Sequence, residues 1–195
     1  MWHRTWFALA SIFTLAVMSA EASGATRFGS KLTNQTQPSN AGTGKWCNDN
    51  NHGAMCSWVM TIARNAPGRH RAPKDGVLNQ IRLIACFPGT FVLQIANAKQ
   101  GLGTAKAVRT GPLINYVGDS RHCNGNRYQI ETFAVNVPVK KNDYLSVVGS
   151  KIGFVYCAGD SGSLLFNPPL ADGGAFRTAN DNGDCIMLLE AQYDD

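Results

Sequence analysis

The chain has 195 residues, a formal net charge of +5 at neutral pH and six cysteines. This mildly basic balance suits contact with acidic polymers or cell surfaces, but it does not single out nucleic acid. After Val17 no apolar run approaches the roughly 20 residues that a membrane-spanning helix needs, which excludes such a helix from the rest of the sequence.

The N-terminus has the pattern of an export signal. A short head carries Arg4, an apolar run extends from Trp6 to Val17, and Ala20-Glu21-Ala22 fits the small-x-small rule for signal peptidase. The apolar run is about a dozen residues long, too short for a membrane anchor. We therefore expect residues 1–22 to be a signal peptide and the mature protein to be secreted, either extracellular or periplasmic. Subtracting 22 from 195 leaves 173 residues, which suits one domain.

The six cysteines all follow the predicted signal. An even number of cysteines in an exported chain predicts disulfide bonds. Six cysteines allow fifteen pairings, and the spacing favours only Cys47–Cys56, which brackets a short polar loop. No CxxC pair or HxxxH spacing accompanies the thiols, which argues against zinc. The other four cysteines, whose partners stay open, are Cys86, Cys123, Cys157 and Cys185.

The distribution of apolar residues changes once after the predicted signal peptide. Residues 23–45 contain few large apolar side chains, so this segment cannot offset its ordering entropy, and we expect a flexible N-terminal leader. Residues 46–195 instead alternate short apolar runs with turn residues and predict one all-β domain, a single disulfide-stabilised antiparallel β-sandwich. The predicted strands are Ser57–Ala63, Gln80–Cys86, Thr90–Ala96, Ala105–Thr110, Tyr128–Val137, Tyr144–Val148, Gly153–Cys157, Ser163–Phe166 and Cys185–Gln192. For Cys185–Gln192 a helix is the alternative.

One stretch, "FAVNVPVKKNDYLSVV", predicts a strand, a basic turn at Lys140–Asp143 and a second strand. Pro138 cannot donate to a β-ladder, so it belongs at a strand end or on an edge strand. This corner, the strands bordered by cysteines, and the rhythm from Trp46 to Tyr193 resemble secreted jelly-roll or galactose-binding-like β-sandwich modules. The resemblance implies a scaffold stabilised by disulfides or calcium that binds carbohydrate or a surface through loops at one end.

The sequence "CAGDSG" from Cys157 to Gly162 resembles the nucleophile motif of chymotrypsin-like serine proteases. The resemblance implies Ser161 as the nucleophile, His122 as the base and Asp143 as the residue that orients the histidine. Only 39 residues separate His122 from Ser161, and only 34 follow Ser161, too few for the two barrels of that family. We interpret the motif as a turn between two strands, in which Gly supplies positive φ and Asp and Ser bond nearby N–H groups. A convergent hydrolase on another fold stays as an alternative.

The segment "RNAPGRHRAPK" is the densest group of cations in the chain, with Arg64, Arg69, Arg71 and Lys74 in eleven residues. Such a loop can hold an acidic polysaccharide or another anionic polymer, or it can be an ordinary solvated loop. No aromatic residue interleaves with the cations, so nucleic acid is disfavoured. Trp46 and Tyr116 are the aromatic rings that we expect to contact a sugar.

Three functions agree with the sequence, and we give them in order of preference. The first is a non-catalytic binding module for carbohydrate or an anionic surface polymer, the second a hydrolase that uses Ser161, and the third a structural protein of an extracellular layer. We expect no obligatory cofactor. The loop "NDNGDC" offers Asp181 and Asp184 as candidate calcium ligands, but it lacks the EF-hand spacing, and an ordinary turn explains it equally well.

Overall fold

The computed structural model describes residues 25–33, 45–47, 51, 53–119, 129–157 and 162–193. Within these ranges the protein is all-β, and its only helical element is a 3₁₀ turn, Gln100–Leu102. The strands are β1 Arg27–Gly29, β2 Lys45–Trp46, β3 Cys56–Met60, β4 Gly76–Leu83, β5 Gly89–Lys99, β6 Thr104–Tyr116, β7 Glu131–Val139, β8 Tyr144–Gly149, β9 Lys151–Ile152, β10 Val155–Cys157, β11 Ser163–Phe166, β12 Arg177–Thr178, β13 Asp181–Gly183, β14 Cys185–Met187 and β15 Leu189–Tyr193.

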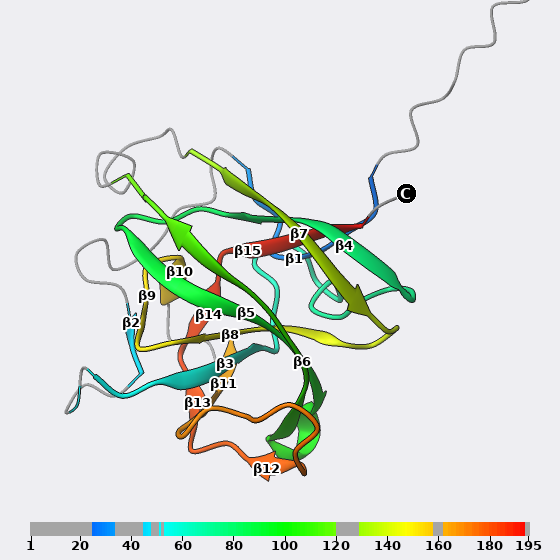
Figure 1. Cartoon of the computed structure of the whole chain (residues 1–195), viewed down its shortest axis with the longest axis vertical. Helices are drawn as coiled ribbons and strands as arrows, with labels where there is room; N and C mark the ends of the chain where they lie inside the picture. Colours follow the sequence, from blue (N-terminus) through cyan, green and yellow to red (C-terminus); the bar gives the residue numbers. More distant parts are fainter. Residues whose placement is uncertain are drawn as a thin grey trace, which may run out of the picture.

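The strands form two principal sheets (Figure 1). A seven-stranded sheet has the order β12-β6-β5-β8-β3-β11-β13, and a four-stranded sheet has the order β1-β15-β4-β7. Two small ribbons, β10-β14 and β2-β9, complete the topology. Every strand pair that the structure describes is antiparallel, and the seven-stranded sheet curls into half a barrel with the four-stranded sheet across one side. The prediction of an antiparallel all-β fold is confirmed.

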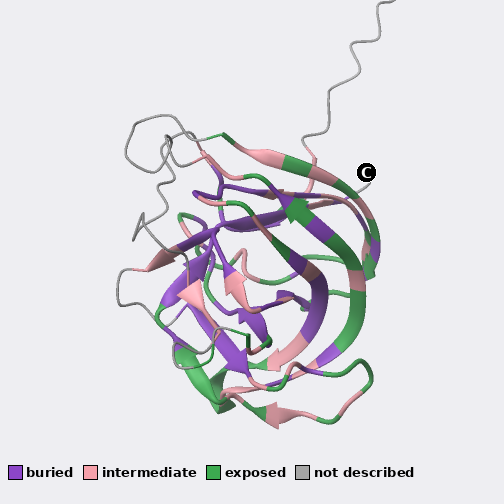
Figure 2. Ribbon diagram, turned by 60° about the vertical axis from the view of Figure 1, so that its left-hand side comes forward, coloured by how far each residue is buried: buried purple, intermediate pink, exposed green. Residues whose placement is uncertain are grey.

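The two principal sheets share one hydrophobic core. Alternate residues of each strand point inward, such as Ile81 on β4, Leu93 on β5 and Val147 on β8, and all three are completely buried. Figure 2 shows the buried residues gathered on the strands, with exposed residues along an outer edge and in the loops. Trp58 on β3 is also completely buried.

The outer face of the seven-stranded sheet is buried as well. Side chains such as Val59 and Phe166 form a second cluster there, under the segment that contains Leu170. This segment is tied down by Gln94, whose amide donates to the Leu170 carbonyl, and by Ser57, whose hydroxyl accepts from the Leu170 N–H. Burial on both faces explains why all five residues of β3 are buried and why its sequence does not alternate.

The turn at Lys140–Asp143 is confirmed, and it connects strands of different sheets. β7 ends at Val139 as the edge of the four-stranded sheet, and β8 begins at Tyr144 in the middle of the seven-stranded sheet. Pro138 lies on this edge strand, as its missing N–H requires.

The structure corrects three expectations. First, Arg27–Gly29 lies in the predicted flexible leader but forms β1, because Phe28 is buried and the strand pairs with β15. Second, the predicted strand Cys185–Gln192 is two strands, β14 and β15, which break at Leu188 and belong to different sheets. Third, β10 and β11 are not a hairpin, because β10 pairs with β14 while β11 lies between β3 and β13.

Two disulfide bonds are described. Cys47–Cys56 is the pair that the spacing favoured, and this prediction is confirmed. Cys157–Cys185 joins β10 to β14, where the two residues are direct partners in the ladder. Cys86 is also disulfide-bonded, and Cys123 lies outside the described residues. No helix in the described part of the chain is long and apolar enough to cross a membrane.

Candidate functional site

The segment 64–74, which we call the basic loop, lies between β3 and β4 and is fixed by backbone hydrogen bonds to two other parts of the fold. The N–H of Gly29 on β1 donates to the Arg69 carbonyl at 2.6 Å. Further along, the Ala72 N–H donates to the Asp143 carbonyl, and the Asn142 N–H donates to the Ala72 carbonyl, each at 2.8 Å. The loop is therefore held against β1 on one side and against the β7–β8 turn on the other.

These contacts create a small cavity of about 170 Å³, which we call the basic cavity. Its cations come from three separate segments: Arg27 from β1, Arg69 and Arg71 from the basic loop, and Lys141 from the β7–β8 turn. No carboxylate is among the described residues that line it, which are Arg27, Phe28, Gly68, Arg69, Arg71, Ala72, Pro73, Lys141 and Asn142. A cavity of this composition attracts anions.

Two of the four cations are held in place by neighbours on β15. The Arg69 guanidinium lies 3.3 Å from the carboxylate of the buried Glu190, and the Arg27 Nε donates to the Gln192 side chain at 2.9 Å. Glu190 therefore offsets part of the charge on Arg69. Arg71 and Lys141 also line the cavity, and within the described residues their side chains form no ion pair.

The other two cations predicted for binding do not line this cavity. The Arg64 guanidinium stacks 3.5 Å from the centre of the Tyr156 ring. The Lys74 ammonium lies 5.3 Å from the centre of the Tyr193 ring. Each cation is thus attracted to an aromatic face, and the eleven-residue loop does not act as one binding patch.

His70 lies in the basic loop between the two arginines of the cavity. Its ring centre is 5.8 Å from that of Tyr144. Burial lowers the pKa of His70, and the adjacent charge of Arg71 lowers it further. His70 therefore favours the neutral form. His52 lies outside the described residues.

The two aromatic residues predicted to contact sugar share a different, small cavity of about 200 Å³. Trp46 is half-buried on β2, with the Lys151 ammonium 4.6 Å from its ring centre. Tyr116 is 4% exposed, and its hydroxyl accepts a hydrogen bond from the Gly153 N–H at 2.9 Å. Tyr116 is thus a core residue with its polar atom engaged, because it packs among Phe91 and Phe154.

The residues of the hydrolase hypothesis are only partly described. Ser161 and His122 lie outside the described residues. Asp143 is buried, and its carboxylate accepts the Lys140 N–H at 2.8 Å, a contact that fixes the turn. The described contacts of Asp143 thus explain its presence without a catalytic role.

The calcium candidates are not gathered into a site. Asp181 and Asp184 are both exposed near β13. In the described part of the chain, no three histidine, cysteine, aspartate or glutamate side chains lie close enough to hold a metal ion.

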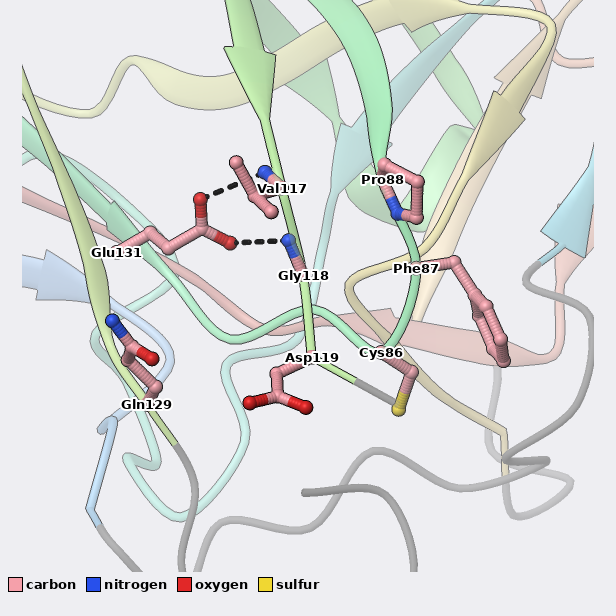
Figure 3. Close-up of a pocket in the computed structure, with 8 residues that line it drawn as sticks. All are labelled: Cys86, Phe87, Pro88, Val117, Gly118, Asp119, Gln129 and Glu131. Atoms are coloured by element: carbon pink, nitrogen blue, oxygen red, sulfur yellow. Dashed lines mark hydrogen bonds between the residues drawn. The ribbon is translucent and has the colours of Figure 1, made fainter. Parts of the chain in front are cut away.

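Another cavity, of about 590 Å³, lies at the other end of β7 (Figure 3). Glu131 reaches from β7 to the end of β6, where its carboxylate accepts the N–H groups of Val117 and Gly118 at 2.9 and 2.8 Å. Asp119 and the disulfide-bonded Cys86 also line this cavity. It contains carboxylates and no cation among its described lining residues, and Glu131 supports the backbone there.

Sequence reasoning missed two of the four cations of the basic cavity. Arg27 lies in the segment that was predicted to be a flexible leader, and Lys141 was identified only as a turn residue. The adjacent basic pair "KK" in the predicted turn was a usable signal for Lys141. Nothing local marked Arg27, because its position depends on the pairing of β1 with β15.

The chain was compared with family models, curated proteins and solved structures. It matches no family model, and no curated protein or solved structure is significantly similar to it.

Proposed function

We propose that the protein is a secreted, non-catalytic binding module that holds an acidic polysaccharide through its basic cavity. The observation that carries this proposal is the convergence of four cations from three segments on one cavity without a lining carboxylate. A jelly-roll-like sandwich, the fold that the sequence resembles, is a suitable scaffold, since its loops lie together at one end.

The size of the basic cavity favours a single charged group. Its volume of about 170 Å³ is below the roughly 300–1,000 Å³ of a typical small-molecule site. A sulfate ester or a carboxylate fits such a space, and guanidinium groups bind both through charge-assisted hydrogen bonds. The rest of the polymer then lies on the surface outside.

The lining of the basic cavity favours a polysaccharide over a nucleic acid. Phe28 is its one aromatic residue among those described, and the ring is 1% exposed. Proteins that bind single-stranded nucleic acid usually stack bases on exposed rings. The basic cavity offers charge without such a stacking platform.

The test is binding to immobilised heparin and polygalacturonate, measured by biolayer interferometry over a series of salt concentrations. We expect Arg71→Gln and Lys141→Ala each to weaken binding about three- to tenfold at low salt, the effect of losing one charge contact. Lys45→Ala is the matched control, because Lys45 lies on the β2–β9 ribbon beyond the far end of β8. It should change the affinity less than twofold.

The same measurement separates the aromatic site from the basic cavity. Loss of binding in Trp46→Ala with full binding in Arg71→Gln and Lys141→Ala would transfer the site to Trp46 and overturn the proposal. Equal binding by all of these variants, or no binding by the wild type, would also overturn it. Thermal unfolding of each variant confirms that the fold is intact.

A further inference from the structure

A second basic cavity is also lined by residues of the β7–β8 turn. It has a volume of about 490 Å³ and contains three cations, Lys106 and Arg109 from β6 and Lys140 from the turn. We call it the second cavity. Its other lining residues are Asp75, Asn97, Val108, Pro138, Val139 and Asp143.

The turn contributes residues to both cavities. Lys140 lines the second cavity, whereas its neighbour Lys141 lines the basic cavity. No described residue that lines the basic cavity also lines the second cavity.

The turn is rigid before any ligand binds. Asp75 accepts the Lys141 N–H at 2.6 Å, and Asp143 accepts the Lys140 N–H at 2.8 Å. Asn142 adopts a φ of 72°, in the left-handed region that asparagine tolerates, and donates its N–H to Ala72. Because these contacts fix the backbone, little conformational entropy is lost when the lysines bind a ligand.

The second cavity differs from the first in its chemistry. Its three cations are partly offset by the carboxylates of Asp75 and Asp143, and it also offers the amide of Asn97. The Lys106 ammonium lies 5.2 Å from the centre of the Phe176 ring, so Arg109 and Lys140 are the cations of this cavity without an aromatic neighbour among the described residues. Val108 and Pro138 add apolar surface. With a volume in the range of small-molecule sites, it suits a whole sugar unit, with its hydroxyls, C–H faces and acidic group.

We propose that one acidic polysaccharide chain crosses the Lys140–Asp143 turn, with an acidic group in the basic cavity and a charged sugar unit in the second cavity. This inference rests on the function proposed above and specifies its ligand as a polymer with at least two acidic units. Joining the two contacts in one chain makes the second one intramolecular and raises the affinity.

The test compares three probes: sodium sulfate, a heparin disaccharide and a long heparin oligosaccharide, each titrated by calorimetry. For the wild type, we expect the long oligosaccharide to bind at least tenfold more tightly than the disaccharide. Lys141→Ala should weaken binding of all three probes. Arg109→Gln and Lys106→Ala in the second cavity should weaken the long oligosaccharide about three- to tenfold and leave sulfate binding unchanged.

The outcomes distinguish this inference from the proposed function. If Lys141→Ala weakens the long oligosaccharide but both second-cavity variants bind it like the wild type, bridging is overturned and the proposed function stands. If none of the three variants changes any affinity, both fail. If a single-stranded DNA of similar length binds as tightly, with the same dependence on Arg109, the assignment to polysaccharide is overturned. Lys45→Ala again serves as the charge-matched control.

Discussion

The guanidinium of Arg69 lies 3.3 Å from the carboxylate of Glu190, and this pair connects the basic cavity to the interior of the four-stranded sheet. The Glu190 side chain is only 4% exposed and also accepts a hydrogen bond from Arg82 at 2.5 Å. A buried carboxylate is tolerated only where cations and hydrogen bonds compensate it. Arg69 therefore has a structural contact on one side and faces the cavity on the other.

We expect Glu190→Gln to destabilise the fold by about 1–3 kcal/mol, because it removes the buried charge that pairs with two partly exposed guanidinium groups. The measurement is urea unfolding followed by tryptophan fluorescence. Glu131→Gln is the control and should have a smaller effect, because it removes an equal charge where the carboxylate accepts two backbone N–H groups and pairs with no described guanidinium. Equal stability of Glu190→Gln and the wild type would contradict the role assigned to this pair.

A second prediction concerns Tyr116. Its hydroxyl accepts the Gly153 N–H, and no other acceptor is described for that group. Tyr116→Phe leaves this buried N–H unsatisfied, so the free energy of unfolding should fall by about 1–3 kcal/mol. Tyr144→Phe is the matched control, since the Tyr144 hydroxyl has no hydrogen bond among the described residues, and its effect should be smaller. Equal losses in the two variants would show that the bond to Gly153 is not the cause.

The two disulfides should differ in their effect on stability. Cys157–Cys185 closes 28 residues of chain and Cys47–Cys56 closes 9. In the chain-entropy model, replacing the first pair by serines lowers the free energy of unfolding by about 3–4 kcal/mol and replacing the second by about 2–3 kcal/mol. Denaturant unfolding of both double variants without reductant tests this order. A larger loss for the Cys47–Cys56 variant would contradict it.

The sequence located most of the longer strands but not their bounds, because a short apolar run between turn residues is a local property, whereas the length of a strand depends on its partners. The predicted strand Ala105–Thr110 covers only part of β6. Ser163–Phe166 matches β11 at both ends, and Tyr144–Val148 falls one residue short of β8. Strands of two or three residues, such as β1 and β12, carry too little pattern to be recognised.

Choice of strand partners was less predictable, because partners are distant in the sequence. The "GDSG" motif predicted a hairpin between β10 and β11, yet these strands pair with β14 and with β3 and β13 respectively. At Leu188 the chain leaves one sheet for another, where its N–H donates to Phe154 and its carbonyl accepts from Ile84. Neither hydrogen bond can be predicted from the local pattern of apolar and polar residues.

Prediction of the candidate site was limited in the same way, because its residues are distant in the sequence. The density of cations in the basic loop correctly drew attention to Arg69 and Arg71. It could not show that Arg64 and Lys74 stack on aromatic rings, since Tyr156 and Tyr193 lie more than ninety residues further along the chain by their numbering. The convergence of charge is a property of the fold.

A fourth prediction concerns the stability of the β7–β8 turn as the pH changes. Burial raises the pKa of Asp143 above its ordinary value of 3.8, despite the hydrogen bond from Lys140. A raised pKa means that the folded state favours the protonated, neutral carboxyl group. The contribution of this group to the free energy of unfolding is therefore fully present below about pH 3.8, and it is lost as the pH rises through the folded-state pKa. Asp143→Asn keeps an oxygen acceptor for the Lys140 N–H and removes the titration.

We expect the stability of Asp143→Asn relative to the wild type to increase from pH 3 to pH 7, in unfolding experiments across that range. Asp181→Asn, at an exposed position, controls for the loss of one negative charge. A relative stability that stays constant or falls over this range would contradict the buried, destabilising charge assigned to Asp143.

The pKa of His70 depends on the charge of the basic cavity and can be used to measure changes in it. Burial is the main cause of its lowered pKa, and the neighbouring charge of Arg71 is the second. Arg71→Gln removes the second cause, so the His70 pKa should rise in that variant. A bound anion that neutralises Arg71 should raise it in the same direction, which an NMR titration of the assigned His70 ring can measure with and without a heparin oligosaccharide. Lys45→Ala should leave the pKa unchanged. If the oligosaccharide binds but the His70 pKa moves in neither case, the ligand lies away from Arg71.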